Sequence, residues 1–231
     1  MTRKINPISL RLGLFQVWDF TIQNYTKLDY YYVLSFFKQF QLNDIILKIL
    51  KFNRFLISDK DFLYINHKLF LNIYVIDINS SLQNKYLLVI SELSKSLSDW
   101  FSLKVYLRIY RKIDYMLTSN LVLNYAIYLI EQNQNFNKVL WLINQFILNH
   151  LNKVKVVYCT KGVRYVYLKG FKIQLVGRFS NTKNQMAKSI QQSFGSLSLI
   201  SLKNYVEFSQ KDLYTKLGSC GLRIWLFYEI K

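Results

Sequence analysis

The sequence predicts an α+β fold, in which helices with one apolar face pack against small sheets. Two observations carry this prediction. Several runs alternate apolar and polar side chains with period two, as half-buried strands do, and other runs place apolar residues at helical spacing. With 231 residues, of which 52% are hydrophobic, the chain is long enough for one or two domains, each with a core of its own.

Residues 1–42 are predicted to form a basic N-terminal extension followed by one helix. Pro7 and Gly13 favour an extended segment with a turn over residues 2–20, and they disfavour a helix there. Aromatic side chains then recur at helical spacing, which predicts a helix with a buried stripe over residues 28–40.

Residues 43–114 are predicted to follow the order helix, strand, strand, helix, strand. The contrast between the two faces of the second strand is weak, which indicates a strand covered on both faces. The expected elements are a helix over residues 44–51 that Asn43 caps, strands over 54–57 and 69–76, a helix over 82–97 and a strand over 103–109.

Residues 115–231 are predicted to form an α/β domain with a small mixed sheet and one helix on its face. Six of the seven glycines lie between Gly162 and Gly221, so this part is expected to contain most of the positions that need a positive φ or a close backbone neighbour. The expected elements are helices over residues 120–131 and 135–151, an added basic hairpin over 153–168, a strand over 171–179, a helix over 181–192, a strand over 197–208, a sharp loop over 218–221 and a closing strand over 222–227.

The charge of the chain indicates a polyanionic partner. Lys and Arg number 31 against 13 acidic residues, for a net charge of +18, and 14 of the basic but only 3 of the acidic residues follow residue 152. No phosphate-binding loop, dinucleotide fingerprint or nucleophile pattern occurs, so neither an enzyme nor a catalytic residue is predicted. Two cysteines without a CxxC pair signal no metal, and no cofactor is expected. Uncharged stretches fall short of the roughly 20 apolar residues of a membrane span.

Motifs at both ends of the chain resemble the small-subunit ribosomal protein S-three family. Residues 170–179 (GFKIQLVGRF), then MAKS, GSLSL and residues 214–227 (YTKLGSCGLRIWLF), follow the order of that family's C-terminal domain. The N-terminal pattern K-x-N-P-x-x-x-R-L-G followed by a tryptophan is matched by Lys4, Asn6, Pro7, Arg11, Leu12, Gly13 and Trp18.

The resemblance implies a structural protein of the small ribosomal subunit. It would bind ribosomal RNA in the head, beside proteins S-ten and S-fourteen, and lie where messenger RNA enters, near S-four and S-five. It also implies a type II K-homology (KH) domain over residues 43–114. A working KH domain clamps nucleic acid with a GXXG loop, but this chain has no glycine between Gly13 and Gly162 and carries Asn-Ser-Ser-Leu at residues 79–82. The domain is therefore expected to be a degenerate scaffold.

The expected RNA contacts lie in the N-terminal extension and in the C-terminal domain. Lys138 is the one basic residue expected on the side of messenger RNA. The remaining candidates are Arg3, Lys4, Asn6, Arg11, Lys172, Arg178, Lys183, Lys188, Lys203, Lys216 and Arg223.

The composition bears on where the protein works. Two alanines and one proline among abundant Ile, Asn and Lys are what an AT-rich organelle genome gives, and no presequence precedes the first motif. Mitochondrial origin is expected, with a plastid as the alternative. Two other functions stay open at this point: a free-standing organellar RNA-binding factor, and a basic protein of a membrane surface.

Overall fold

The computed structural model divides the chain into two compact units. Unit 1 comprises Met1–Trp18 and Asp114–Lys231, and unit 2 comprises Asp19–Ile113. The expected boundary after residue 42 falls inside a helix, and the N-terminal 18 residues belong with the C-terminal part. The residues that the structure describes are 5–14, 16–18, 29–65, 68–77, 83–100, 104–111, 117–132, 135–179, 186–197 and 199–230.

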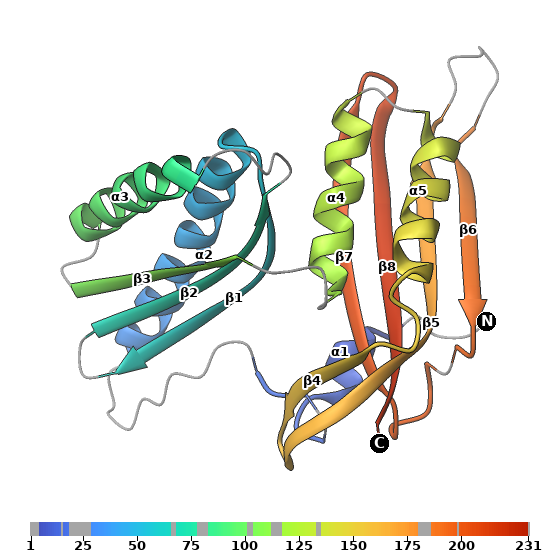
Figure 1. The fold of residues 1–231 in the computed structure, drawn as a ribbon, viewed down its shortest axis with the longest axis horizontal. Helices are drawn as coiled ribbons and strands as arrows, with labels where there is room; N and C mark the ends of the chain where they lie inside the picture. The colour runs from blue at the N-terminus through green and yellow to red at the C-terminus, as the bar shows by residue number, and fades with distance from the viewer. Residues whose placement is uncertain are drawn as a thin grey trace. The chain divides into compact units, whose positions relative to one another are not determined.

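Unit 2 has the predicted order helix, strand, strand, helix, strand (Figure 1). Strand β1 is antiparallel to β2, and β2 is parallel to β3, so the three-stranded sheet is mixed. The order of these elements is the one that the resemblance implied, while residues 79–82 lie outside the described residues. The elements are α2 (Asp29–Phe52), β1 (Phe55–Ile65), β2 (Lys68–Asp77), α3 (Gln83–Trp100) and β3 (Lys104–Arg111).

Two expectations for unit 2 were wrong. The two helices predicted on either side of Asn43 are one continuous helix, because Leu42, Ile46 and Leu50 form a single buried stripe four residues apart. Asn43 caps nothing there; its side-chain oxygen accepts a hydrogen bond from Lys60 Nζ at 3.0 Å. Strand β2 is buried on one face only, since its other face carries half-buried side chains such as Tyr74.

Unit 1 is a five-stranded sheet with helices α4 and α5 on one face (Figure 1). The strand order is β4-β5-β8-β7, and β6 pairs with β5 farther along the edge that β4 occupies. Every described pairing is antiparallel, although this sheet was expected to be mixed. The elements are α1 (Pro7–Arg11), α4 (Ser119–Glu131), α5 (Phe136–Leu148), β4 (Val154–Cys159), β5 (Gly162–Gly177), β6 (Lys188–Gly195), β7 (Tyr205–Thr215) and β8 (Gly218–Ile230).

The core of unit 1 lies between the sheet and its two long helices. Strands β5 and β8 turn every second side chain inward, and α4 and α5 close over them with buried aliphatic side chains. Burial of this size is the main stabilising term of a domain. The fully or almost fully buried members include Phe171, Ile173, Leu175, Leu222, Ile224 and Leu226 from the sheet and Val122, Ala126, Ile143 and Ile147 from the helices.

Four boundaries in unit 1 differ from the expectation. Residues 7–11 form a short helix that Asn6 caps, where an extended segment was expected. A helix was expected over residues 181–192, but residues 188–195 form strand β6. The hydrogen bonds that β6 makes with β5 take the place of those within a helix. The expected strand at 197–208 begins only at Tyr205, and the turn before β8 lies at residues 216–217. Helices α4 and α5 and the hairpin β4–β5 are confirmed.

Candidate nucleic-acid interface

The sheet of unit 1 has an open face, opposite to α4 and α5. Residues paired across neighbouring strands point to the same side, so the register gives the rows of this face directly. Side chains that alternate with the buried ones make up the open face. Within unit 1, the long helices α4 and α5 both lie on the other face (Figure 1).

One row of the open face combines a cation with two aromatic rings. Lys172 in β5 is paired with Trp225 in β8, and Trp225 with Phe208 in β7. The ammonium group of Lys172 lies 5.5 Å from the centre of the Trp225 ring, and the Phe208 and Trp225 rings lie 5.2 Å apart. All three side chains are half-buried, so they offer both charge and ring surface to a ligand.

The adjacent row consists of polar side chains that donate and accept hydrogen bonds. Gln191, Gln174, Arg223 and Gln210 follow one another across β6, β5, β8 and β7. Amide and guanidinium groups bind phosphate oxygens and base edges. Lys172 and Arg223, both selected from the sequence, thus lie on one surface in adjacent rows.

Four further predicted residues gather at one end of unit 1, called here the basic end. Arg178 follows β5 directly, Lys188 pairs with the last residue of β5, and Lys216 lies in the turn that joins β7 to β8. Lys138 is in the first turn of α5, whose Phe136 ring packs 5.0 Å from that of Phe179.

The basic end keeps a positive balance. Lys138, Lys188 and Lys216 are exposed, and Arg178 is half-buried. The acidic residues described near this end are Glu131, the last residue of α4, and Asp212 in β7, both exposed. The cations outnumber the acids, which suits a polyanion.

Arg11 corrects one of the predicted RNA contacts. Its side chain is fully buried, and its guanidinium donates to the carbonyl oxygens of Pro7, Leu199, Ser201 and Asn204 at 2.8–3.0 Å. Burial lowers the pKa of Arg11. The residue therefore fastens the N-terminal segment to the connection before β7 and offers no group to a phosphate.

The other predicted contacts are spread more widely. Asn6 is exposed, but its side-chain oxygen is engaged as the cap of α1, where it accepts from Ile8 N at 3.0 Å. Lys203 is exposed just before β7, away from the basic end. Arg3, Lys4 and Lys183 lie outside the described residues.

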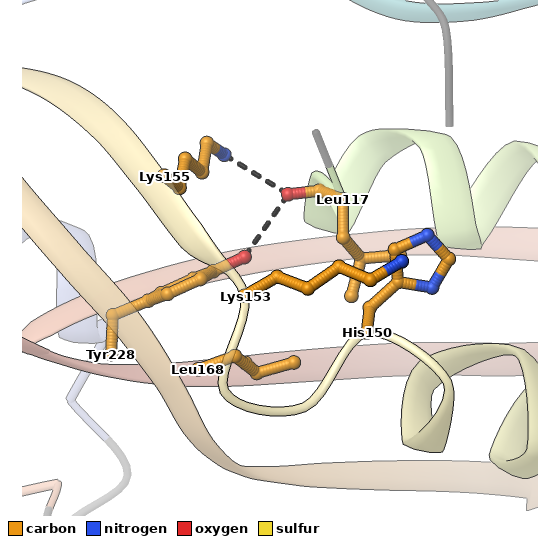
Figure 2. A pocket seen from close by; sticks show the side chains of 6 residues that line it. All are labelled: Leu117, His150, Lys153, Lys155, Leu168 and Tyr228. Carbon is orange, nitrogen blue, oxygen red and sulfur yellow. Dashed lines mark hydrogen bonds between the residues drawn. The ribbon is translucent and has the colours of Figure 1, made fainter. Parts of the chain in front are cut away.

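A second cluster of cations in unit 1 has a structural role. Figure 2 shows Lys155 and Tyr228 converging on the carbonyl oxygen of Leu117, to which each donates at 3.0 Å, with His150 and Lys153 beside them. The hollow that these residues line has a volume of about 10 Å³, which is the space of a single water molecule. It is too small for a phosphate or a base.

The three-stranded sheet of unit 2 also bears stacked rings, but its charge is different. Phe70 stacks on Tyr106 at 5.0 Å and Tyr74 on Tyr110 at 5.3 Å. Burial and the nearby carboxylate of Asp61 raise the pKa of Tyr74. On this surface Asp61 is in register with Asn72, and Asn72 with Arg108, so a carboxylate accompanies the cation. The two rows of the open face hold Lys172 and Arg223 without an acidic residue, so the open face and the basic end of unit 1 are the better candidate for a nucleic-acid interface.

Sequence reasoning missed the aromatic part of this interface. Trp225 occupies an outward position of β8, whose inward positions Leu222, Ile224 and Leu226 are apolar, and Phe208 is paired with it in β7. That alternation was the available signal, since an aromatic ring at an outward position of a half-covered sheet meets solvent or a ligand.

Two other classes of site are missing from the described residues. They contain no group of three or more His, Cys, Asp or Glu side chains placed to hold a metal ion. None of the described helices combines the length and the apolar character needed to cross a membrane.

Comparison with known proteins connects these surfaces to a family. No profile of a known protein family matches the chain. Small ribosomal subunit protein uS3m of Chondrus crispus is 40% identical over 233 residues, which cover 100% of this chain and 95% of that protein. Small ribosomal subunit protein uS3c of Euglena longa is 23% identical over 98% of this chain.

The identity with the mitochondrial relative extends along the whole chain, including both units. The resemblance inferred from the terminal motifs is confirmed, and so is the expected mitochondrial location. The protein belongs to the uS3 family of small ribosomal subunit proteins and is a ribosomal protein of the mitochondrion.

Proposed function

We propose that this protein is a structural component of the mitochondrial small ribosomal subunit that holds ribosomal RNA on the open face and the basic end of unit 1. Membership of the uS3 family supports the first part. The observation that carries the second is the row of Lys172, Trp225 and Phe208, with Arg223 in the row beside it.

The mechanism is charge neutralisation on a rigid surface. Lys and Arg side chains that contact phosphates release the counterions condensed on the RNA, and this release supplies affinity that falls with salt. Trp225 and Phe208 add ring surface on which an unpaired base can stack, at about 1–3 kcal/mol per base. Such contacts position the RNA and read little of its sequence. The role is structural, and no chemical step is assigned to it.

The proposed neighbours follow from the family. We place the protein in the head of the subunit, beside S-ten and S-fourteen, with S-four and S-five where messenger RNA enters. Lys138 is exposed and is the single charged residue of α5. This helix therefore offers one cation to incoming messenger RNA, so its grip on the message is weak.

The test is a salt titration of the full chain with head-domain ribosomal RNA and with an unrelated RNA. Lys172→Ala and Arg223→Ala should each flatten the slope of log affinity against log salt by somewhat less than about one unit, for both RNAs alike. The control is Lys169→Ala, because Lys169 already forms an ion pair with Glu229. Unchanged slopes in both variants would exclude the open face as the binding surface.

A second measurement tests the placement in the ribosome. The protein should sediment with small subunits at high salt. A free-standing RNA-binding factor would dissociate from them, and a membrane-surface protein would stay with the membrane fraction.

A further inference from the structure

The hairpin β4–β5 carries apolar side chains on both of its faces. On the inner face, Val157, Cys159 and Val166 are buried in the core of unit 1. The outer face, called here the hairpin face, consists of Val154, Val156, Tyr158, Val163, Tyr165 and Tyr167. A two-stranded ribbon that faced water would carry polar residues there, whereas strands covered on both sides are apolar throughout.

The register makes the hairpin face continuous. It pairs Val154 with Tyr167, Val156 with Tyr165, and Tyr158 with Val163, so that each pair joins one valine to one tyrosine. Cross-strand pairs of this kind stabilise the hairpin itself by about 0.2–1 kcal/mol each. They leave most of the outer surface in water, since Tyr158 is 77% exposed, Tyr165 58% and Val163 55%.

The charged side chains of the hairpin lie outside the hairpin face. None of its six side chains is charged. Lys155 points to the inner side, where it pairs with Glu207, and Arg164 lies opposite Val157 on that same side. Lys153 and Lys161 lie at the two ends of the ribbon, as a basic rim. The hairpin face is therefore an apolar centre with cations at its edge.

We propose that the hairpin face is a docking surface for a neighbouring protein whose own contact patch is apolar at the centre and acidic at the rim. Protein interfaces place aromatic residues at a centre depleted of charge, with polar groups around it. Tyrosine is among the residues that most often carry the binding energy.

The contrast with the open face favours a protein over RNA as the occupant. The open face places Lys172 and Arg223 among its rings, so a phosphate meets a cation there. The hairpin face has no cation among its rings, and an RNA lying on it would keep its phosphates unneutralised. Within one unit, the two surfaces thus suit two different kinds of partner.

The proposal rests on the placement of this protein in the small subunit, and the test separates the two claims. A photoreactive phenylalanine analogue replaces Tyr158 in one tagged full-length chain and Phe208 in another. Small subunits that contain each chain are purified and irradiated. The Tyr158 position should crosslink to a ribosomal protein at a peptide with apolar residues beside acidic ones, and the Phe208 position should crosslink to RNA.

Substitution gives the quantitative arm. The double substitution Tyr158→Ser and Tyr165→Ser should leave this chain in the subunit but weaken binding of the partner protein that the crosslink identifies about tenfold. Without irradiation, washing conditions that leave half of the partner bound to the unsubstituted subunit should leave about a tenth of it bound to the substituted one. Phe52→Ser is the control, because Phe52 is an aromatic residue of unit 2 that is 89% exposed and lies on neither surface, and it should leave retention of the partner unchanged.

Each remaining outcome overturns one of the two claims. A crosslink from position 158 to RNA, to lipid, to a second copy of this chain or to nothing would overturn the docking proposal, even if the substituted chains failed to assemble. Loss of the RNA crosslink at position 208, with the protein crosslink at 158 kept, would overturn the RNA interface and leave the docking surface in place.

Discussion

Lys155 and Glu207 form an ion pair although their strands, β4 and β7, stand at opposite ends of the order β4-β5-β8-β7. Three strand spacings would separate β4 from β7 by about 14 Å in a flat sheet. The pair therefore reports how strongly this sheet curls. Each side chain is only 12% exposed, and Glu207 also accepts from the backbone N–H of Ser119 at the start of α4.

Removing one partner of this pair should destabilise unit 1. Glu207→Gln leaves the Lys155 ammonium buried without its counter-charge, which is expected to lower the free energy of unfolding by about 3 kcal/mol. Urea unfolding of the full chain measures the change. Lys169→Met is the control, because the Lys169–Glu229 pair is half-exposed and should contribute less than about 1 kcal/mol. Equal effects of both substitutions would show that the Lys155–Glu207 pair contributes no more to the free energy of unfolding than the half-exposed pair does.

Arg11→Lys should loosen the N-terminal segment without weakening the contact with RNA. A lysine ammonium cannot reach the four carbonyl oxygens that the guanidinium satisfies, and two or more unsatisfied buried acceptors cost about 2 kcal/mol or more. Limited proteolysis should cut the N-terminal segment sooner, while the salt slope of RNA binding stays unchanged. A flatter slope would mean that Arg11 does contact RNA.

Gly195→Ala should be far more harmful than Gly13→Ala. Both glycines have a left-handed backbone, with φ of +78° and +82°. An alanine there costs about 1–2 kcal/mol from conformation alone. At Gly195 the new Cβ would also overlap the carbonyl oxygen of Lys169, whereas Gly13 has open space around it. The difference in the free energy of unfolding between the two variants measures that overlap, and the absence of a difference would mean that the β5–β6 pairing yields easily.

Cys159 should react slowly with iodoacetamide in the folded chain. Burial raises the pKa of its thiol above the ordinary 9.0, against an opposing attraction from Arg164. A raised pKa keeps the thiol protonated, so the native reaction should begin at higher pH than in urea. The same shift stabilises the fold below pH 9 and is lost as the pH rises through the native pKa.

The measurement uses the Cys220→Ser chain, so that one thiol remains. Alkylation is followed by mass spectrometry between about pH 7 and 10, where an unperturbed thiol titrates. Arg164→Met should shift the onset to still higher pH, because the attraction that favours the thiolate is removed. Native and unfolded chains that react at the same pH would contradict the buried environment of Cys159.

The sequence predicted the elements whose pattern is local. Strands β5 and β8 were found because Phe171, Ile173 and Leu175 on one, and Leu222 and Ile224 on the other, alternate with polar residues. Helices α4 and α5 were found because their apolar residues recur at helical spacing. The α+β class followed from these elements.

The elements that failed depend on distant partners. Strand β6 is an edge strand with polar side chains such as Gln191 and Ser193, so it shows no alternation, and only its pairing with β5 makes it a strand. Helix α2 was split at Asn43 because a capping residue looks the same whether or not a helix begins there.

The residues of the candidate site were predicted only in part, as the elements of the fold were. Lys172 and Arg223 were selected by residue type, and the register then placed them together. Arg11 was selected by the same argument and failed, because its carbonyl partners Leu199, Ser201 and Asn204 belong to the other end of the chain. Residue type gives the charge of a side chain, and the fold decides whether that charge faces a ligand.

Strand β8 is the last strand of the chain, yet it lies between β5 and β7 inside the sheet. Synthesis runs from the N-terminus, so the strand that joins the two halves of unit 1 leaves the ribosome after β4, β5, β6 and β7. The first 18 residues belong to the same unit, but all of unit 2 is synthesised between them and the rest of unit 1. Unit 2 is continuous in the chain and can fold meanwhile, domain by domain. Unit 1 closes only after β8 has been made, so a product truncated before β8 would lack a finished open face.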